Sequence, residues 1–214
     1  MRVTHQLMGQ SLNHHLSKSL RRLYDENRKI ATGTRIQYPS DDPVGFEATT
    51  RLGATIRRLE QYHKNVDDAL AWLGLTESAL AQAGEGVHRA RQLAVQAANG
   101  TLTEGDRADV AREIAQIIDD LLDIGNTRYG SRYIFGGLKG DAPPFVRQED
   151  GFAYVGSSSG EWVEYEIGPG LTLRVGVNGD EALVPVLDAL TALESALHAN
   201  DTTEIDRALG ELDA

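Results

Sequence analysis

The sequence contains no cysteine among its 214 residues, so disulfide bonds and thiolate-ligated metal centres are excluded. It also has no apolar run long enough to span a membrane, and its first twenty residues lack the apolar core of a cleavable signal peptide. We therefore expect a protein that stays in the cytoplasm or leaves the cell by a route needing no cleavable signal. A cysteine-free chain is compatible with export in the unfolded state through a narrow channel.

Catalytic and nucleotide-binding motifs are missing as well. The sequence has no glycine-rich loop followed by Lys and Ser/Thr, no GxGxxG between a strand and a helix, and no serine nucleophile elbow. His14 and His15 are adjacent on a predicted helix and point in different directions, which makes a poor metal pair. The acidic group at Asp119, Asp120 and Asp123 has no histidine partner, which is typical of a solvated face. We expect no enzyme, no cofactor and no metal.

Basic residues are scarce and unevenly placed. The net charge of −11 argues against nucleic acid as a partner, because phosphate binding needs a basic surface. Residues 1–36 carry seven basic and two acidic side chains, whereas residues 161–214 carry twelve acidic and two basic ones. This polarity favours head-to-tail contact within one chain or between copies. Two separate solvated faces would explain it equally well.

Helical periodicity dominates the first half. Residues 6–30 carry leucines at Leu12, Leu16, Leu20 and Leu23, which predicts an amphipathic helix ending near Gly33. After it, Asp41 or Asp42 can cap the next helix and Pro43 suits its first position. A seam in coiled-coil spacing then predicts one long bundle helix ending near residues 99–100. The seam residues are Leu52, Ile56, Leu59, His63, Val66, Leu70, Leu73, Glu77, Leu80, Gly84, Val87, Arg91 and Ala94.

A second helix follows after a short turn. Thr103 and Asp106 stand three apart, as in a capping box, with an acid in place of the usual Glu or Gln. Its apolar stripe has the same spacing, so we expect an antiparallel hairpin whose two apolar seams face each other. The stripe residues are Val110, Ile114, Ile117, Leu121 and Ile124.

From residue 131 onward, glycine and proline pairs separate short runs with period-two alternation, at 152–155, 162–167 and 171–177, which predicts strands. Helical spacing returns after residue 184. The predicted fold is mainly α with an inserted small β-domain: a long antiparallel, coiled-coil-like helical rod plus an antiparallel β-domain. We divide the chain into an N-terminal helix and turn (1–36), a helical hairpin (37–130), the β-domain (131–183) and returning helices (184–214).

Three segments resemble the flagellin superfamily, and within it the proteins that join the flagellar hook to the filament. The segment 30–44 is similar to the family's S/T-G-K/R-R-I…DDP turn, and residues 99–103 are similar to its second hairpin turn. The run NTRYGSRYIFGG at 126–137 is similar to the junction proteins' N-T-R…G-R-Y-I/L-F-G/S-G, where flagellin has N-T-x-F-N-G. The resemblance covers essentially the whole chain.

This resemblance implies a structural component of the bacterial flagellum, an adaptor at the hook–filament junction on which flagellin assembles. It implies secretion by type III export without a cleavable signal peptide. The implied partners are the first hook-associated protein, flagellin, further copies in a ring and, for a full-length chain, an export chaperone; no nucleic acid and no membrane insertion is expected. Family members close their rod with a long C-terminal helix, and we expect that helix to be missing here.

The candidate assembly residues lie on the first helix and the turn after it: Leu7, Leu12, Leu16, Leu23, Ile30, Arg35, Asp41 and Asp42. Intramolecular packing and capping explain the same residues. Two alternatives stay open, namely a flagellin or flagellin-like filament subunit, and a β-domain that binds a surface glycan through Tyr154, Trp162 and Tyr165. Such aromatic residues more often pack across strands.

Overall fold

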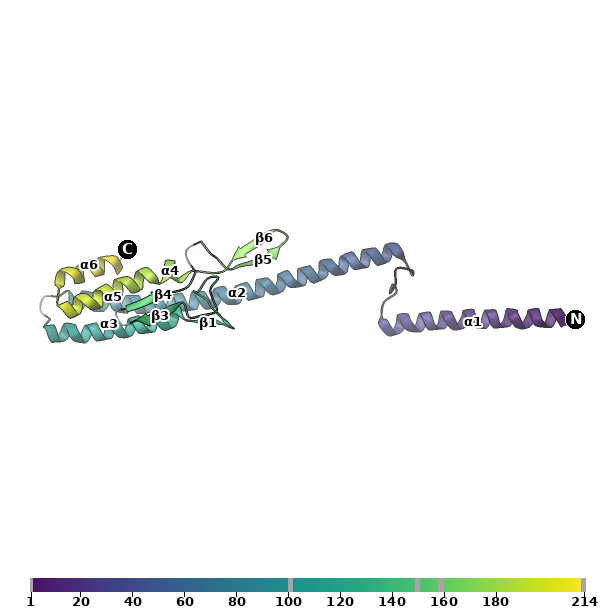
Figure 1. Ribbon diagram of the computed structural model, residues 1–214, viewed down its shortest axis with the longest axis horizontal. Coiled ribbons are helices and arrows are strands. Elements are labelled where there is room, and N and C mark those ends of the chain that lie inside the picture. The colour runs from purple at the N-terminus through teal and green to yellow at the C-terminus, as the bar shows by residue number, and fades with distance from the viewer. Residues whose placement is uncertain (1, 100–101, 149–150, 158–159, 213–214) are drawn as a thin grey trace. The chain divides into compact units, whose positions relative to one another are not determined.

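The computed structural model describes residues 2–99, 102–148, 151–157 and 160–212, with side chains from Leu7 onward. It is mainly helical with small antiparallel strand pairs, which confirms the predicted fold class (Figure 1). The chain forms two compact units, one up to Glu60 and one from Gln61 onward.

The first unit holds α1 (Arg2–Thr32) and the beginning of α2 (Pro43–Ala97). Gly33 follows α1 with φ 67°, the left-handed conformation predicted for the end of this helix. The backbone N–H of Gly45 donates to Oδ1 of Asp42 at 3.0 Å. Asp42 therefore caps α2, and the helix begins at Pro43 as predicted.

In the second unit, α2 and α3 (Glu104–Gly125) are antiparallel neighbours. Arg89 of α2 forms an ion pair with Glu113 of α3, and a Cβ at Gly86 would lie 3.6 Å from a methyl carbon of Leu121. The predicted capping box at the start of α3 is present: the Thr103 hydroxyl accepts from the N–H of Asp106, and the Asp106 carboxylate accepts from the N–H of Thr103. The bundle is completed by α5 (Val184–Ala199), which lies against α3, and by α6 (Thr202–Leu212), which lies against α5 (Figure 1). A short α4 (Gly179–Ala182) precedes them.

The strands of the described residues pair as three separate antiparallel hairpins. They are β1 (Arg128–Tyr129) with β2 (Arg132–Tyr133), β3 (Phe145–Gln148) with β4 (Gly151–Tyr154), and β5 (Glu164–Gly168) with β6 (Leu171–Arg174). The sequence predicted β4, β5 and β6 but not the first three strands. The β5–β6 hairpin is held to α2, because Asn65 donates from Nδ2 to the carbonyl of Glu166 at 2.6 Å and the hydroxyl of Tyr62 donates to its carboxylate at 3.0 Å.

The core of the second unit lies between the helices and the base of the hairpins. The α3 stripe is buried as predicted, from Val110 through Ile114 and Ile117 to Leu121. Trp72 of α2 is 2% exposed and stands edge-on to Tyr129 of β1, with 5.7 Å between ring centroids. The first hairpin is therefore packed against α2.

The predicted seam of α2 has the right spacing but the wrong register. In the second unit the buried residues of this helix are Tyr62, Ala69, Trp72, Thr76, Ala79, Ala83, Ala90, Leu93, Ala94 and Ala97, of which Ala94 alone belongs to the predicted seam. Most lie one position before a predicted seam residue, and Leu70, Leu73, Glu77 and Arg91 are exposed. The buried alanines of α2 belong to the core cluster, together with the larger residues of α3 and α5. The larger leucines lie on an adjacent face.

Candidate assembly surfaces

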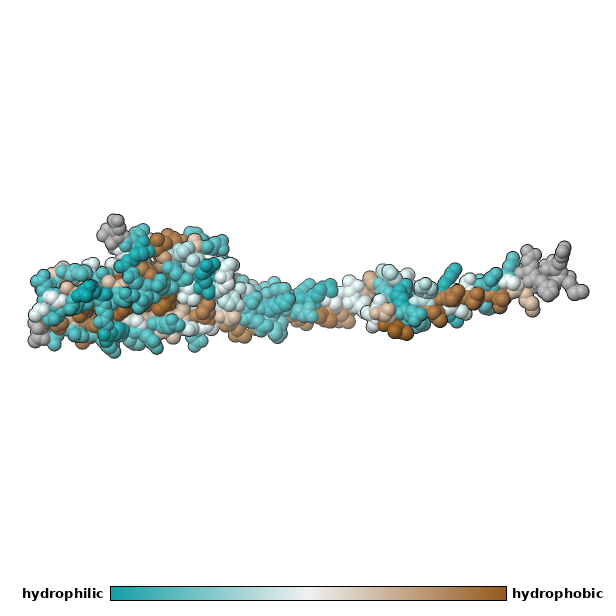
Figure 2. Space-filling view, turned by 90° about the horizontal axis from the view of Figure 1, so that it is seen from below, coloured by the Kyte–Doolittle hydropathy of each residue, from teal (hydrophilic) through white to brown (hydrophobic). Residues whose placement is uncertain are grey.

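The α1 helix has an apolar stripe that no other described residue of the first unit covers. Leu12 is 71% exposed and Leu16 is 58% exposed, and Leu23 and Ile30 are exposed to a similar degree. Figure 2 shows hydrophobic residues on one side of this helix and hydrophilic residues on another. Because each buried leucine stabilises a fold by about 1.5–3 kcal/mol, an open stripe of this length is typical of a contact surface.

The stripe differs from the predicted set of assembly residues at two leucines, Leu7 and Leu20. Leu7 and Leu12 are five residues apart, which places them roughly 140° apart around a helix that turns 100° per residue. Leu7 is exposed but lies on another side of α1 from the stripe. Leu20 is 53% exposed, lies between Leu16 and Leu23, and was not among the predicted assembly residues. Its spacing of four from Leu16 would have been sufficient to include it.

The turn between α1 and α2 is held by its own carboxylates. Asp41 accepts hydrogen bonds from the backbone N–H groups of Gln37 and Tyr38, each at 3.1 Å, and these bonds hold the pKa of Asp41 below its ordinary value. Arg35 lies 3.5 Å from the carboxylate of Asp42. The three predicted turn residues are thus close together, and each has an intramolecular role.

The beginning of α2 adds further exposed apolar residues within the first unit. Val44, Leu52, Ile56 and Leu59 are all more than half exposed. The last three belong to the predicted seam, although they were not predicted as assembly residues. Both helical segments of the first unit therefore present apolar side chains that their own unit leaves open.

The NTRYGSRYIFGG run has a structural role in the second unit. Asn126 follows α3 and bonds Phe145 twice: its Nδ2 donates to the Phe145 carbonyl at 2.9 Å, and its Oδ1 accepts from the Phe145 N–H at 3.1 Å. The Asn126 side chain therefore bonds the backbone of Phe145 in β3 as a neighbouring strand would. Ile134 and Phe135, near the end of the run, are fully buried.

The glycine pair of the same run lies against buried polar side chains. Gly137 has φ 60°, and a Cβ there would lie 2.7 Å from Oδ1 of Asn178 and 2.8 Å from Cβ of Ser157. Ser157 and Asn178 are fully buried, and the Ser157 hydroxyl accepts from the N–H of Lys139 at 3.0 Å. Only glycine fits this conformation and this spacing without displacing its neighbours.

The three aromatic residues of the glycan hypothesis do not form a common open surface. The guanidinium of Arg174 covers one face of Trp162 at 2.6 Å from the ring centroid. The hydroxyl of Tyr154 donates to the carbonyls of Phe135 and Ser157, each at 3.0 Å, and burial raises the pKa of Tyr154. Tyr165 packs against the core. Each of the three side chains is therefore engaged by other residues of the same chain.

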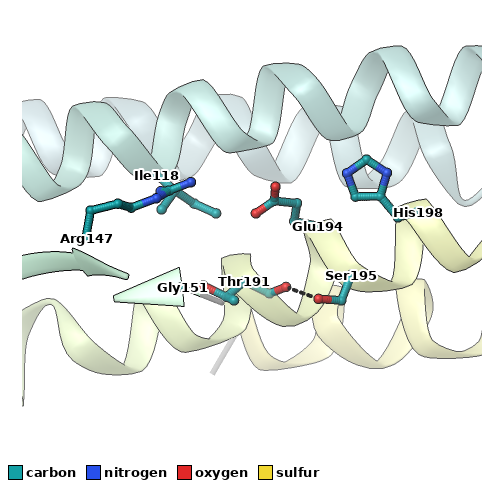
Figure 3. Close-up of a pocket in the computed structure, with 7 residues that line it drawn as sticks. All are labelled: Ile118, Arg147, Gly151, Thr191, Glu194, Ser195 and His198. Carbon is teal, nitrogen blue, oxygen red and sulfur yellow. Dashed lines mark hydrogen bonds between the residues drawn. The ribbon is translucent and has the colours of Figure 1, made fainter. Parts of the chain in front are cut away.

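The second unit also has a cavity of about 270 Å³ between α3, α5 and the β3–β4 hairpin. Figure 3 shows Arg147 and His198 at its two ends, with Glu194 between them. Arg147 is paired with Asp119 at 2.7 Å, and the hydroxyls of Thr191 and Ser195 donate to helix carbonyls. Nothing in this arrangement activates a nucleophile or a general base.

Two other kinds of site are absent from the part of the chain that the structure describes. No three His, Asp or Glu side chains there lie close enough together to hold a metal ion. No described helix is both long enough and apolar enough to cross a membrane.

The comparisons with known proteins agree with the resemblance seen in the sequence. Residues 3–139 match the family model described as the bacterial flagellin N-terminal helical region. Flagellar hook-associated protein 3 of Escherichia coli K12 is 31% identical over 193 residues, covering 90% of this chain and 58% of that protein. A flagellin of Halalkalibacterium halodurans is 26% identical over 214 residues, covering all of this chain and 69% of that protein.

A solved structure gives the same result for the fold. The crystal structure of Bacillus cereus FlgL is 29% identical, with a TM-score of 0.65 over 78% of this chain and 81% of that chain. The chain spans 58% of the length of the Escherichia coli relative. The family model covers well over half of the chain. The chain therefore belongs to the bacterial flagellin family, whose members are structural proteins and not enzymes.

Proposed function

We propose that this protein is the adaptor at the hook–filament junction of a bacterial flagellum. Its similarity to hook-associated protein 3 supports this assignment, together with the junction-type run at 126–137 in place of the flagellin version. In this role the protein forms a ring between the first hook-associated protein and flagellin. It reaches the flagellum by export without a cleavable signal peptide, and a full-length chain is bound by an export chaperone beforehand.

The single observation that carries the proposal at the physical level is the open apolar stripe of α1. A soluble monomer gains nothing from a helix that exposes Leu12, Leu16 and Leu23 to water. In an assembly the stripe would pack against helices of neighbouring subunits, with 3.5-residue spacing as in a coiled coil. Arg35, Asp41 and Asp42 then fix the turn that orients α1.

Flagellin itself is the second candidate, because the chain also matches a flagellin over its whole length. The two functions differ in where the protein lies and in its copy number. A junction protein occupies one narrow band at the base of each filament, whereas flagellin occupies the filament along its length.

Immunogold labelling of intact flagella tests this difference. Antibodies raised against residues 131–183 should label one band per flagellum, at the boundary between hook and filament. Label distributed along the filament would contradict the junction assignment and support the flagellin alternative. Antibodies against the source cell's flagellin provide the matched control, since they must label the filament and leave the band unlabelled.

A further inference from the structure

The cavity between α3, α5 and the β3–β4 hairpin contains a carboxylate that no described residue neutralises. Glu194 of α5 is half-buried, and its carboxylate forms no ion pair or hydrogen bond within the part of the chain that the structure describes. Figure 3 shows this side chain between Arg147 and His198. Partial removal of a charge from water costs free energy unless a partner compensates it. The fold therefore leaves an uncompensated charge in this cavity.

The arginine of the same cavity is already paired. Arg147 lies 2.7 Å from the carboxylate of Asp119, so the charges of these two residues compensate each other. His198 also lines the cavity, and an imidazole is largely neutral at about pH 7.5. The net charge of the lining is then that of Glu194.

Two hydroxyl groups of the lining are available as acceptors only. The hydroxyl of Thr191 donates to the carbonyl of Leu187 at 2.8 Å, and that of Ser195 donates to the carbonyl of Thr191 at 3.0 Å. Because a hydroxyl has a single proton, each of these oxygens can now only accept. Ile118 of α3 adds an apolar wall. The cavity therefore presents acceptors and one negative charge beside an apolar surface.

We propose that this cavity binds an alkyl cation, an ammonium or guanidinium group on an aliphatic stem, such as the side chain of a lysine or arginine of another molecule. The cationic group pairs with Glu194 and donates to the oxygens of Thr191 and Ser195, while the stem contacts Ile118. The volume of about 270 Å³ is just below the roughly 300–1,000 Å³ of small-molecule sites, so it suits one side chain better than a cofactor. The proposal goes beyond the junction function and does not depend on it.

The cavity is formed within the second unit and does not involve α6. Its lining residues belong to α3, α5 and the β3–β4 hairpin. Ala192 faces a hollow that α5 shares with α6, and it is turned by roughly 100° from Thr191 around the axis of α5. The contact with α6 and the cavity therefore lie on different sides of α5.

The chain itself carries cations of the required kind. Lys18, Arg21 and Arg22 of α1 are exposed, and none of them has an ion-pair partner among the residues that the structure describes. They belong to the basic segment 1–36, whereas Glu194 belongs to the acidic segment 161–214. This complementarity of charge favours α1 of a second copy as the source of the bound side chain.

Titration with n-butylammonium, the cation and stem of a lysine side chain, tests the site in solution. Amide and methyl NMR spectra of the 214-residue chain are recorded at about pH 7.5, where imidazoles are largely neutral. Saturable shifts should be largest at Ile118, Gly151 and Thr191, with a dissociation constant in the millimolar range. n-Butanol has a similar stem but no charge, and it should produce no saturable shift at these residues.

Two variants of α5 assign the binding to one carboxylate. Glu194→Gln keeps the shape of the side chain and removes its charge, so the affinity for n-butylammonium should fall about tenfold or more. Asp188→Asn removes the same charge from an exposed residue of the same helix and should leave the affinity unchanged. No saturable binding by the parent chain, or equal binding by Glu194→Gln, would overturn the proposal.

The stability of Glu194→Gln provides an independent readout. The variant removes a half-buried charge that has no partner in the free chain, so its melting temperature should rise by about 1–2 °C. Saturating n-butylammonium should raise the melting temperature of the parent chain and leave that of the variant unchanged. A lower melting temperature of the free variant would show that Glu194 supports the fold instead, which contradicts the proposal.

Spectra recorded at increasing protein concentration, without added amine, identify the source of the cation. If α1 of a second copy supplies it, the signals of Gly151 and Thr191 should shift as the concentration rises. Lys18→Gln/Arg21→Gln/Arg22→Gln should abolish this shift and retain the binding of n-butylammonium. Binding of the amine without any shift on concentration would overturn the second copy as the source and assign the cation to a different protein.

Discussion

Arg107, in the first turn of α3, donates a hydrogen bond from its guanidinium to the side-chain oxygen of Asn200, the residue that links α5 to α6. Its Nε also donates to the carbonyl of Ala97, the last residue of α2, at 3.1 Å. Arg107 is only 6% exposed. One buried cation thus connects the ends of three helices, and it lies where the α2 carbonyls carry partial negative charge.

Removal of this cation should destabilise the second unit. In Arg107→Met the aliphatic stem is retained, but the carbonyl of Ala97 and the amide oxygen of Asn200 lose their donor. We expect a loss of about 3 kcal/mol in the free energy of unfolding, measured by urea denaturation. Arg112→Met, on the exposed side of the same helix, should change it by less than about 0.5 kcal/mol. Equal losses in both variants would show that the buried contacts contribute little.

Asn200 should show a backbone requirement in addition to its hydrogen bond. It is the one described non-glycine residue with positive φ, at 57°. Asn200→Gly keeps this conformation accessible and loses only the acceptor, for a cost of about 1.5 kcal/mol. Asn200→Ala should cost about 1 kcal/mol more, because alanine is strained there. When Arg107 is already replaced by Met, neither Asn200 variant should lose the hydrogen bond again. The difference in stability between Asn200→Gly and Asn200→Ala should remain.

Substituting alanine at Gly137 and at Gly130 distinguishes the cost of backbone strain from the cost of a steric overlap. Their φ angles are 60° and 61°, but only at Gly137 would a Cβ contact buried neighbours. Gly130→Ala should therefore cost about 1 kcal/mol, for strain alone. Gly137→Ala should cost roughly 2 kcal/mol more, because the methyl group overlaps Asn178 and Ser157. Thermal melts of the two variants in one buffer provide the comparison, and equal costs would contradict the role assigned to the glycine pair.

Asp106 should make stability depend on pH in the acid range. The Thr103 hydroxyl and then the Thr103 N–H bond its carboxylate and hold the pKa of Asp106 below the ordinary value of 3.8. A carboxyl group whose pKa is lowered by folding stabilises the folded state above its unfolded pKa, and this contribution is lost as the pH falls through the folded pKa. Asp106→Asn should therefore melt below the parent at pH 7 and equally with it near pH 2. A constant difference across this range would contradict the charged capping box.

Much of this fold could be predicted from capping and periodicity. Asp42, Pro43 and Thr103 set helix starts through bonds between near neighbours, and such bonds can be read from spacing alone. The face of α2 that is buried could not be predicted, because leucine and alanine occupy adjacent positions along this helix. Hydrophobicity favours the leucines, but Ala79 and Ala83 are the residues buried in the core.

The long-range polar contacts could not be predicted from the sequence either. A charged residue is rarely buried unless it is paired, and the partners of Arg107 lie on segments ten and 93 residues away. The first hairpin has strands of two residues each, too short for a period-two pattern. The candidate assembly residues were partly predictable, since the leucine spacing places Leu12, Leu16 and Leu23 on one side of α1.

The central claim, that the α1 stripe is an assembly surface and not part of a core, is tested by Leu16→Asp/Leu23→Asp in the source cell. We expect swimming to be abolished while the melting temperature of the purified chain stays within about 2 °C of the parent, because exposed substitutions change stability little. Gln10→Asp/Ser17→Asp adds the same charge to another side of α1 and should leave swimming intact. Normal swimming by the leucine variant, or a large fall in its melting temperature, would contradict the account.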